Sequence, residues 1–179
     1  SAAASFNPSH KLLDQFSEAA IDHKILSRKQ ARIKGINLFQ NLDLPDPSFI
    51  GDRWPHQVSG GQLLRMMVAM SMSCNPDLLV FDEPTTALDV TTQIEVLKTI
   101  KEVIDLNNNA AIYITHDLAV VSQIANSLMV LRHGNIVEIG ETNRVINTPK
   151  EKYTKDLLNS KISNNFIKKN KNCLLYTSD

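Results

Sequence analysis

Two adjacent carboxylates, Asp82 and Glu83, stand directly after the short apolar run LLVF at residues 78–81. Such a run predicts a strand buried on both faces of a parallel sheet, and sheets of this kind place ligand chemistry where their strands end. Asp82 is suited to hold Mg²⁺ there, because this cation prefers carboxylate and phosphate oxygens. Glu83 points to the opposite side of the chain and could orient or deprotonate an attacking water. The alternative is two solvated carboxylates at a strand end, and the apolar run before them and PTTALD after them argue against it.

A glycine pair marks a second candidate site, in SGGQ at residues 59–62. Apolar residues at helical spacing predict a helix from Ser59 to Ser73, so the Ser59 hydroxyl and the N–H groups of Gly60 and Gly61 would lie at its amino end. Unpaired N–H groups and the positive end of the helix dipole favour a phosphate at that position. The alternative is a plain N-capped helix, which the local pattern favours at least as strongly.

His116 stands near the end of a second apolar segment, AIYITHD at residues 111–117. If this strand neighbours the first in a parallel sheet, His116 is in register with Asp82 and Glu83, and its imidazole could donate to a γ-phosphate. The other four histidines have no comparable context and are predicted to be surface or loop residues: His10, His23, His56 and His133.

The elements that must position these residues change from helices alone to alternating strands and helices. Helices are predicted at 9–20 and 27–40, with Ser9 and Ser27 as possible N-caps, and the proline-rich stretch 43–57 is predicted to be a loop. After the helix at 59–73 come a strand at 77–83, a helix at 91–106, a strand at 110–117, a short helix at 118–125 and a hairpin around residues 133–135. This order indicates an α/β core preceded by an all-helical segment.

Composition excludes several other classes of protein. The 179 residues carry 19 basic and 19 acidic side chains, with no dense basic block before residue 150, so nothing indicates a nucleic-acid or anionic-membrane surface. Cys74 and Cys173 form neither a metal-binding spacing nor a disulfide framework. No apolar run approaches the ~18 residues that span a bilayer. The sequence also lacks a phosphate-cradling G-x-x-x-x-G-K-[ST] loop, because none of its six glycines is followed by lysine.

Together and in this order, the motifs resemble those of the ATP-binding subunit of an ABC transporter. VSGGQ at 58–62 is similar to the signature motif, LLVFDE at 78–83 to Walker B, TALD at 86–89 to the D-loop, and YITHD at 113–117 to the switch-histidine segment. SFNP at 5–8, IVEIGET at 136–142 and YTKDLL at 153–158 resemble importers of the dipeptide and oligopeptide type. The resemblance implies the C-terminal part of a P-loop NTPase domain, with a helical subdomain followed by parallel-sheet core strands.

The resemblance also implies a role for each candidate residue. In that family two nucleotide-binding subunits close head to tail on ATP and Mg²⁺. They drive permease subunits, to which a solute-binding protein delivers the solute. Carried over, Asp82 would hold Mg²⁺, Glu83 would serve the attacking water, His116 the γ-phosphate and Asp89 the dimer contact. The signature residues would bind ATP held by the partner subunit: Ser59, Gly60, Gly61 and Gln62. The implied activity is an ATPase on the cytoplasmic face of the cell membrane that energises import of peptides or related solutes.

The two ends of the chain carry further expectations. SAAASFNP resembles what directly follows the family's Q-loop glutamine, so the P-loop region is expected to precede Ser1 and the chain to be a truncated piece without ATPase activity of its own. The expected divisions are a helical subdomain with the signature at 1–75, a catalytic core half at 76–148 and a C-terminal extension at 149–172. Residues 173–179, CLLYTSD, are expected to be translated sequencing adapter, because a nucleotide string that encodes them resembles the end of a common transposase-based adapter.

Two other functions fit the same motifs. A DNA-repair or chromosome-maintenance ATPase shares the signature and Walker B, but the neutral charge, the short helical segment and YTKDLL speak against it. The other alternative is a natural truncated subunit that is not itself an enzyme and lends only its SGGQ face to a complete partner.

Overall fold

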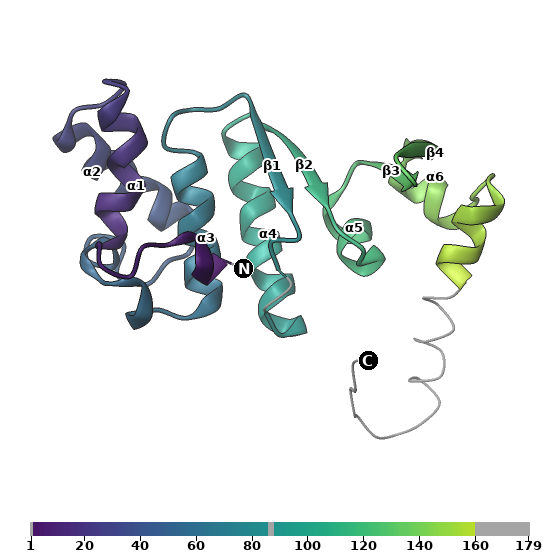
Figure 1. Ribbon diagram of the computed structural model, residues 1–179, viewed down its shortest axis with the longest axis horizontal. Coiled ribbons are helices and arrows are strands. Elements are labelled where there is room, and N and C mark those ends of the chain that lie inside the picture. The colour runs from purple at the N-terminus through teal and green to yellow at the C-terminus, as the bar shows by residue number, and fades with distance from the viewer. Residues whose placement is uncertain (1, 86–87, 160–179) are drawn as a thin grey trace, which may run out of the picture. The chain divides into compact units, whose positions relative to one another are not determined.

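The computed structural model, which describes residues 2–85 and 88–159, divides into two compact units, Ser1–Ile114 and Thr115–Asp179. The first unit opens with helices: η1 (Ala2–Ser5), α1 (Leu12–Asp22), α2 (Arg28–Asn41), η2 (Ile50–Asp52), η3 (Pro55–Gln57) and α3 (Gly60–Ser71). A strand, a helix and a strand complete it: β1 (Leu78–Asp82), α4 (Val90–Leu106) and β2 (Ala110–Ile114) (Figure 1). The second unit contains α5 (Leu118–Ile124), β3 (Ser127–Arg132), β4 (Asn135–Glu141) and α6 (Thr142–Asn147), and residues 152–159 are also helical.

A continuous apolar core holds the first unit together. The rings of Phe16 on α1 and Phe39 on α2 meet edge to face, with their centroids 5.3 Å apart. α3 adds the fully buried Leu64, Met66 and Val68, and the cluster continues to Leu79 and Phe81 on β1 and to the buried side of α4. Of the α3 methionines, Met66 belongs to this core, and Met67 and Met70 are partly buried against it.

The two strands of the first unit are parallel neighbours, as predicted. The register runs from Leu78 opposite Ala110 to Asp82 opposite Ile114, and α4 connects the two strands. In the second unit β3 and β4 form the predicted antiparallel hairpin, with Gly134 in the turn at a φ of 78°. The α/β class, with a parallel strand pair after a helical segment, is confirmed.

The prediction that both strands are buried on both faces is wrong within the described residues of this unit. Burial alternates along β1, where the side chains of Leu78 and Val80 are 49% and 59% exposed, and Ile112 and Ile114 on β2 are exposed in the same way. Successive strand residues point to opposite faces, and the core described above covers only the face of Leu79 and Phe81. The apolar residues on both sides of β1 suit a sheet that is covered on both faces. The described residues of this unit cover one of those faces.

The helix starts test the predicted caps. Ser27 caps α2 in a reciprocal capping box with Gln30, as predicted. Ser9 is not the cap of α1, because the helix begins after Lys11 and the Ser9 N–H donates to the Asn7 side chain. The stretch 43–57 is a loop containing the short helices η2 and η3, which the sequence does not predict. None of the described helices is long and apolar enough to cross a membrane.

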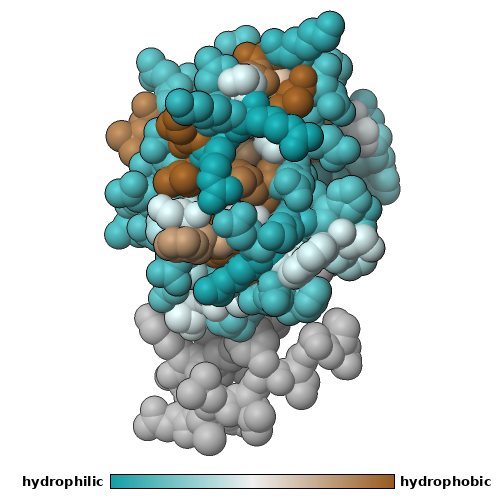
Figure 2. All heavy atoms as spheres, turned by 90° about the vertical axis from the view of Figure 1, so that its left-hand side faces the viewer, coloured by the Kyte–Doolittle hydropathy of each residue, from teal (hydrophilic) through white to brown (hydrophobic). Residues whose placement is uncertain are grey.

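The outer side of the helical segment, formed by α1 and α2, is mainly hydrophilic with separate apolar patches (Figure 2). Its composition fits a solvent-facing surface, although Ile33 on α2 is an apolar side chain that is largely exposed. The four histidines predicted to lie on the surface, at positions 10, 23, 56 and 133, are all exposed.

Candidate functional site

The SGGQ segment forms the capped first turn of α3. The Ser59 hydroxyl accepts a hydrogen bond from the Gln62 N–H at 3.3 Å, and the Gln62 side chain accepts one from the Ser59 N–H at 3.0 Å. This reciprocal pair is a capping box, so the N-cap interpretation of the sequence is confirmed. Ser59 and Gly60 are exposed, so the amino end of the helix, where anions are favoured, is open to solvent. Capping and anion binding are thus compatible at this end of α3.

The two glycines allow α3 to approach α4 closely. Gly61 is buried, and a Cβ atom there would lie 2.9 Å from Cγ2 of Thr92 and 3.5 Å from Cγ2 of Val96. A Cβ on Gly60 would lie 3.2 Å from Cδ2 of Leu88. Gly61 therefore has a packing reason to be glycine that the sequence pattern alone does not reveal.

Asp89 is the N-cap of α4. Its carboxylate accepts a hydrogen bond from the Thr92 N–H at 3.0 Å, and this bond lowers the pKa of Asp89. Because Gly61 meets Thr92 and Gly60 meets Leu88, the amino ends of α3 and α4 lie beside each other. The structure thus brings the predicted residues Ser59 to Gln62 and Asp89 to one exposed edge with two helix amino ends.

Asp82 and Glu83 lie at the carboxyl edge of the strand pair. Asp82 is the exposed last residue of β1, opposite Ile114 of β2. The Glu83 N–H donates to the Ile114 carbonyl at 3.0 Å, which extends the pairing by one residue. Glu83 is half-buried and has a left-handed backbone with a φ of 46°. Such a conformation is unfavourable for a residue with a side chain, and strained positions of this kind cluster at functional sites.

His116 is an exposed residue of the second unit, two positions after Ile114. The prediction that His116 is in register with Asp82 is wrong, because Asp82 pairs with Ile114 and β2 ends at that residue, before His116. Beside it, the Asp117 N–H donates to the Thr115 hydroxyl at 3.1 Å, directly before α5 begins at Leu118. The approach of the His116 imidazole to a phosphate stays a prediction.

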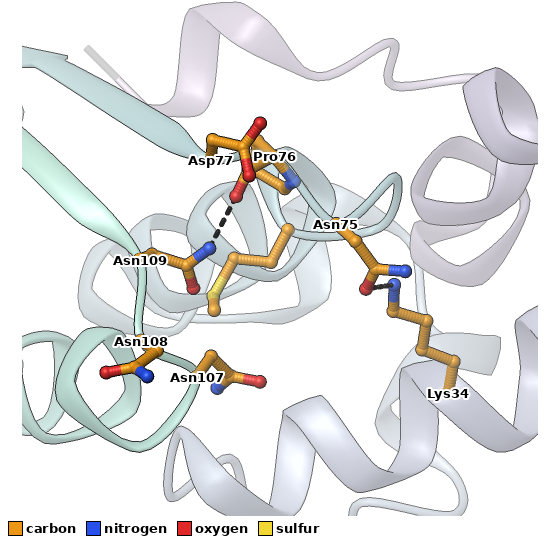
Figure 3. A pocket seen from close by; sticks show the side chains of 8 residues that line it. Lys34, Asn75, Pro76, Asp77, Asn107, Asn108 and Asn109 are labelled. Atoms are coloured by element: carbon orange, nitrogen blue, oxygen red, sulfur yellow. Dashed lines mark hydrogen bonds between the residues drawn. The ribbon is translucent and has the colours of Figure 1, made fainter.

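A polar pocket of about 230 Å³ lies at the opposite, amino ends of the two strands (Figure 3). Lys34 on α2 donates to the Ser73 carbonyl at 2.7 Å and to the Asn75 side chain, and burial lowers the pKa of Lys34. From the other side, the Asn109 side chain donates to the Pro76 carbonyl. These bonds hold the connection between α3 and β1 from two directions. Since ligands of open α/β sheets bind at the carboxyl ends, this pocket belongs to the structural support of the sheet.

One polar network in the second unit was not predicted. The buried Glu138 carboxylate accepts from Arg144 Nη1 at 2.9 Å, from the Lys150 N–H at 3.0 Å and from the Glu151 N–H at 3.2 Å. The Lys150 N–H contributes most to lowering the pKa of Glu138 to about 2. The available signal was an acidic residue between the apolar residues Val137 and Ile139. Its hydrogen bonds attach the segment after α6 to the hairpin.

Comparison with known proteins shows which family the chain resembles. Residues 3–86 match the family model described as ABC transporter. The chain is 40% identical over 152 residues to the probable D,D-dipeptide transport ATP-binding protein DdpD of Escherichia coli (strain K12), a match that covers 85% of this chain and 46% of the relative. Over these residues the chain is similar to the ABC transporter family and to a transport ATP-binding protein. The resemblance drawn from the motifs is therefore confirmed, together with the class of P-loop NTPase domain that it implies.

Other relatives of this chain carry related names. The dipeptide transport ATP-binding protein DppD of Bacillus subtilis (strain 168) is 42% identical over 154 residues, covering 86% of this chain and 46% of the relative. The glutathione import ATP-binding protein GsiA of Escherichia coli (strain K12) is 38% identical over 154 residues, covering 86% of this chain and 25% of the relative. The chain thus spans about half the length, or less, of these curated relatives. Their names describe ATP-binding proteins of dipeptide transport and of glutathione import, so they do not favour the DNA-repair alternative.

Proposed function

We propose that this chain forms the signature, Walker B and D-loop part of an ATP-binding and ATP-hydrolysing subunit of an importer for peptides or related solutes. The observation that carries the proposal is the order of the motifs in a chain about 40% identical to dipeptide transport ATP-binding proteins over most of its length. The subunit would act on the cytoplasmic side of the membrane, paired with a second nucleotide-binding subunit. Permease subunits, and through them a solute-binding protein, would be its other partners.

The exposed amino end of α3 supports the proposed nucleotide contact. The open amino end of α3 and the Ser59 hydroxyl are suited to phosphate oxygens, and glycine at position 60 leaves the backbone there without a side chain in the way. In the proposed dimer this helix end contacts ATP held by the partner subunit, and Asp89 lies at the subunit contact. Gln62 supports the helix end by completing the capping box.

The carboxyl edge of β1 supports the proposed hydrolytic role. Among the described residues no three His, Cys, Asp or Glu side chains gather into a metal site. Mg²⁺ in nucleotide sites needs fewer, since one or two carboxylates and the phosphates hold it, and the exposed Asp82 at the end of β1 fits that requirement. The bound Mg²⁺–ATP would supply the phosphoanhydride bond and the charge neutralisation. Glu83 would orient the attacking water or accept its proton, and His116 would donate to the terminal phosphate.

The test uses the natural gene product that contains this chain. We expect ATPase activity that Glu83→Gln lowers by at least about a hundredfold, because the variant keeps the shape of the side chain and removes the base. Glu102→Gln, on the exposed surface of α4, is the matched control and should keep full activity. Full activity in Glu83→Gln would contradict the assigned role. Recovery of DNA rather than permease subunits with the purified protein would contradict the importer.

The 179-residue chain by itself provides a second test. None of its glycines belongs to a phosphate-cradling loop, so the chain alone should show no measurable ATPase activity. If the purified chain hydrolysed ATP and Glu83→Gln abolished that activity, another segment of these residues would have to bind the phosphates.

A further inference from the structure

A partly buried pair of hydroxyl groups links β2 to the segment that follows Glu83. The Tyr113 hydroxyl on β2 lies 3.2 Å from the Thr85 hydroxyl, and either can donate. Thr85 is only 4% exposed. The Tyr113 ring is held by Phe81, its partner across the strand pair, with ring centroids 6.1 Å apart. The strand pairing therefore fixes the phenol, and the phenol places Thr85.

Thr85 in turn is connected to the amino ends of both helices. The Leu88 N–H donates to the Thr85 carbonyl at 3.0 Å. The Leu88 side chain packs against the core and lies 3.2 Å from the Cβ position of Gly60. Asp89, the next residue, caps α4. A displacement of Thr85 would therefore also shift Leu88, and with it the contact at Gly60 and the position of Asp89.

We propose that Tyr113 is a positioning residue for the hydrolytic site. Its hydroxyl fixes Thr85, two residues after Glu83, and through Leu88 it aligns the carboxyl edge of β1 with the amino ends of α3 and α4. The effect of Tyr113 on hydrolysis rests on the function proposed above. The chain of contacts from Tyr113 through Thr85 to Leu88 does not depend on that function. A small misplacement of groups that must meet a reacting centre lowers the rate without a change in any residue that touches it.

The kinetic experiment compares four variants of the natural gene product. Tyr113→Phe and Thr85→Val each remove one hydroxyl at nearly constant shape, Thr85→Ser keeps the hydroxyl, and Tyr153→Phe, whose ring faces Arg132 in the second unit, is the matched control. We expect the first two to lower kcat for ATP by about tenfold with KM unchanged, because a hydrogen bond of ordinary strength is lost. Thr85→Ser should keep most of kcat, and the control all of it. Combining the first two changes should lower kcat no further than either alone.

Amide exchange of Leu88 tests the link without any turnover. Its N–H is bonded to the Thr85 carbonyl, so Tyr113→Phe and Thr85→Val should each speed its exchange about tenfold, and Tyr153→Phe should not. If the parent protein hydrolyses no ATP, the proposed function fails while the exchange result still decides whether Tyr113 holds this segment. Unchanged Leu88 exchange, or an unchanged kcat in an active enzyme, would overturn the proposal.

Discussion

The contact between Gly61 and α4 leads to a prediction about stability. In Gly61→Ala the new methyl would lie 2.9 Å from Cγ2 of Thr92, well inside the usual carbon–carbon contact of about 3.5–4.0 Å. Thr92 is β-branched and stands in the first turn of α4, so it has few rotamers into which it can withdraw. The two helices must therefore separate or Thr92 must leave its preferred rotamer.

The magnitude follows from two opposing effects. Overpacking of a fitted contact typically costs about 1–3 kcal/mol, whereas replacing glycine by alanine in a helix returns up to about 1 kcal/mol. We therefore expect Gly61→Ala to lower the free energy of unfolding of the first unit by about 1–2 kcal/mol. Gly60→Ala is the matched control, because it gains the same propensity and meets only the flexible end of Leu88 at 3.2 Å. Its effect should lie near zero.

Urea unfolding followed by the fluorescence of Trp54, the single tryptophan, measures the effect in the correct unit. Thr92→Ser removes the methyl that clashes, so adding it to Gly61→Ala should restore most of the lost stability. Equal stability of the two alanine variants would refute the close-contact explanation. Failure of Thr92→Ser to restore stability would refute the assignment of the clash to that methyl.

Three further predictions concern charged groups. The pKa of Asp89 is lowered from 3.8, so the stability from its cap is present above that pH and is lost as the pH falls below it; Asp89→Asn should flatten this acid dependence of the urea midpoint. The pKa of Glu138 falls from 4.5 to about 2, so its hold on the Lys150 N–H should weaken between those pH values; Glu138→Gln should speed Lys150 amide exchange already at neutral pH. Lys34→Met should lower the unfolding free energy of the first unit by about 1 kcal/mol, measured with urea, because the Ser73 carbonyl loses its donor.

The order and type of the elements could be predicted because the signals are local. Helical spacing locates α2, α3 and α4, and the apolar runs locate β1 and β2, since each pattern repeats within a few residues. The Ser59 cap is also local, because its partner Gln62 is three residues away. Prediction fails where the deciding contact is distant in sequence. The Gly61 contact with Thr92 and the Glu138 bonds to residues 150 and 151 carry no short-range pattern.

Burial was the least predictable property of the strands. Composition shows that Leu78 and Val80 suit a covered face, but it does not show which residues cover it. The candidate site residues were proposed because their types and order resemble those of a family, and their geometry was not part of that resemblance. Thr85 and Tyr113, joined across 28 positions, are an example of a support that only coordinates reveal.

The left-handed backbone at Glu83 affects how inactive variants should be chosen. At a φ of 46°, a residue with a side chain costs roughly 1–2 kcal/mol that glycine does not. Glu83→Gln keeps this strain, and under the role proposed for Glu83 it should lower turnover without changing the backbone. Glu83→Gly relieves it, so that variant should melt at a higher temperature than its parent while losing turnover. The difference in melting temperature between Glu83→Gly and its parent would measure how much stability the protein loses by keeping a carboxylate at position 83.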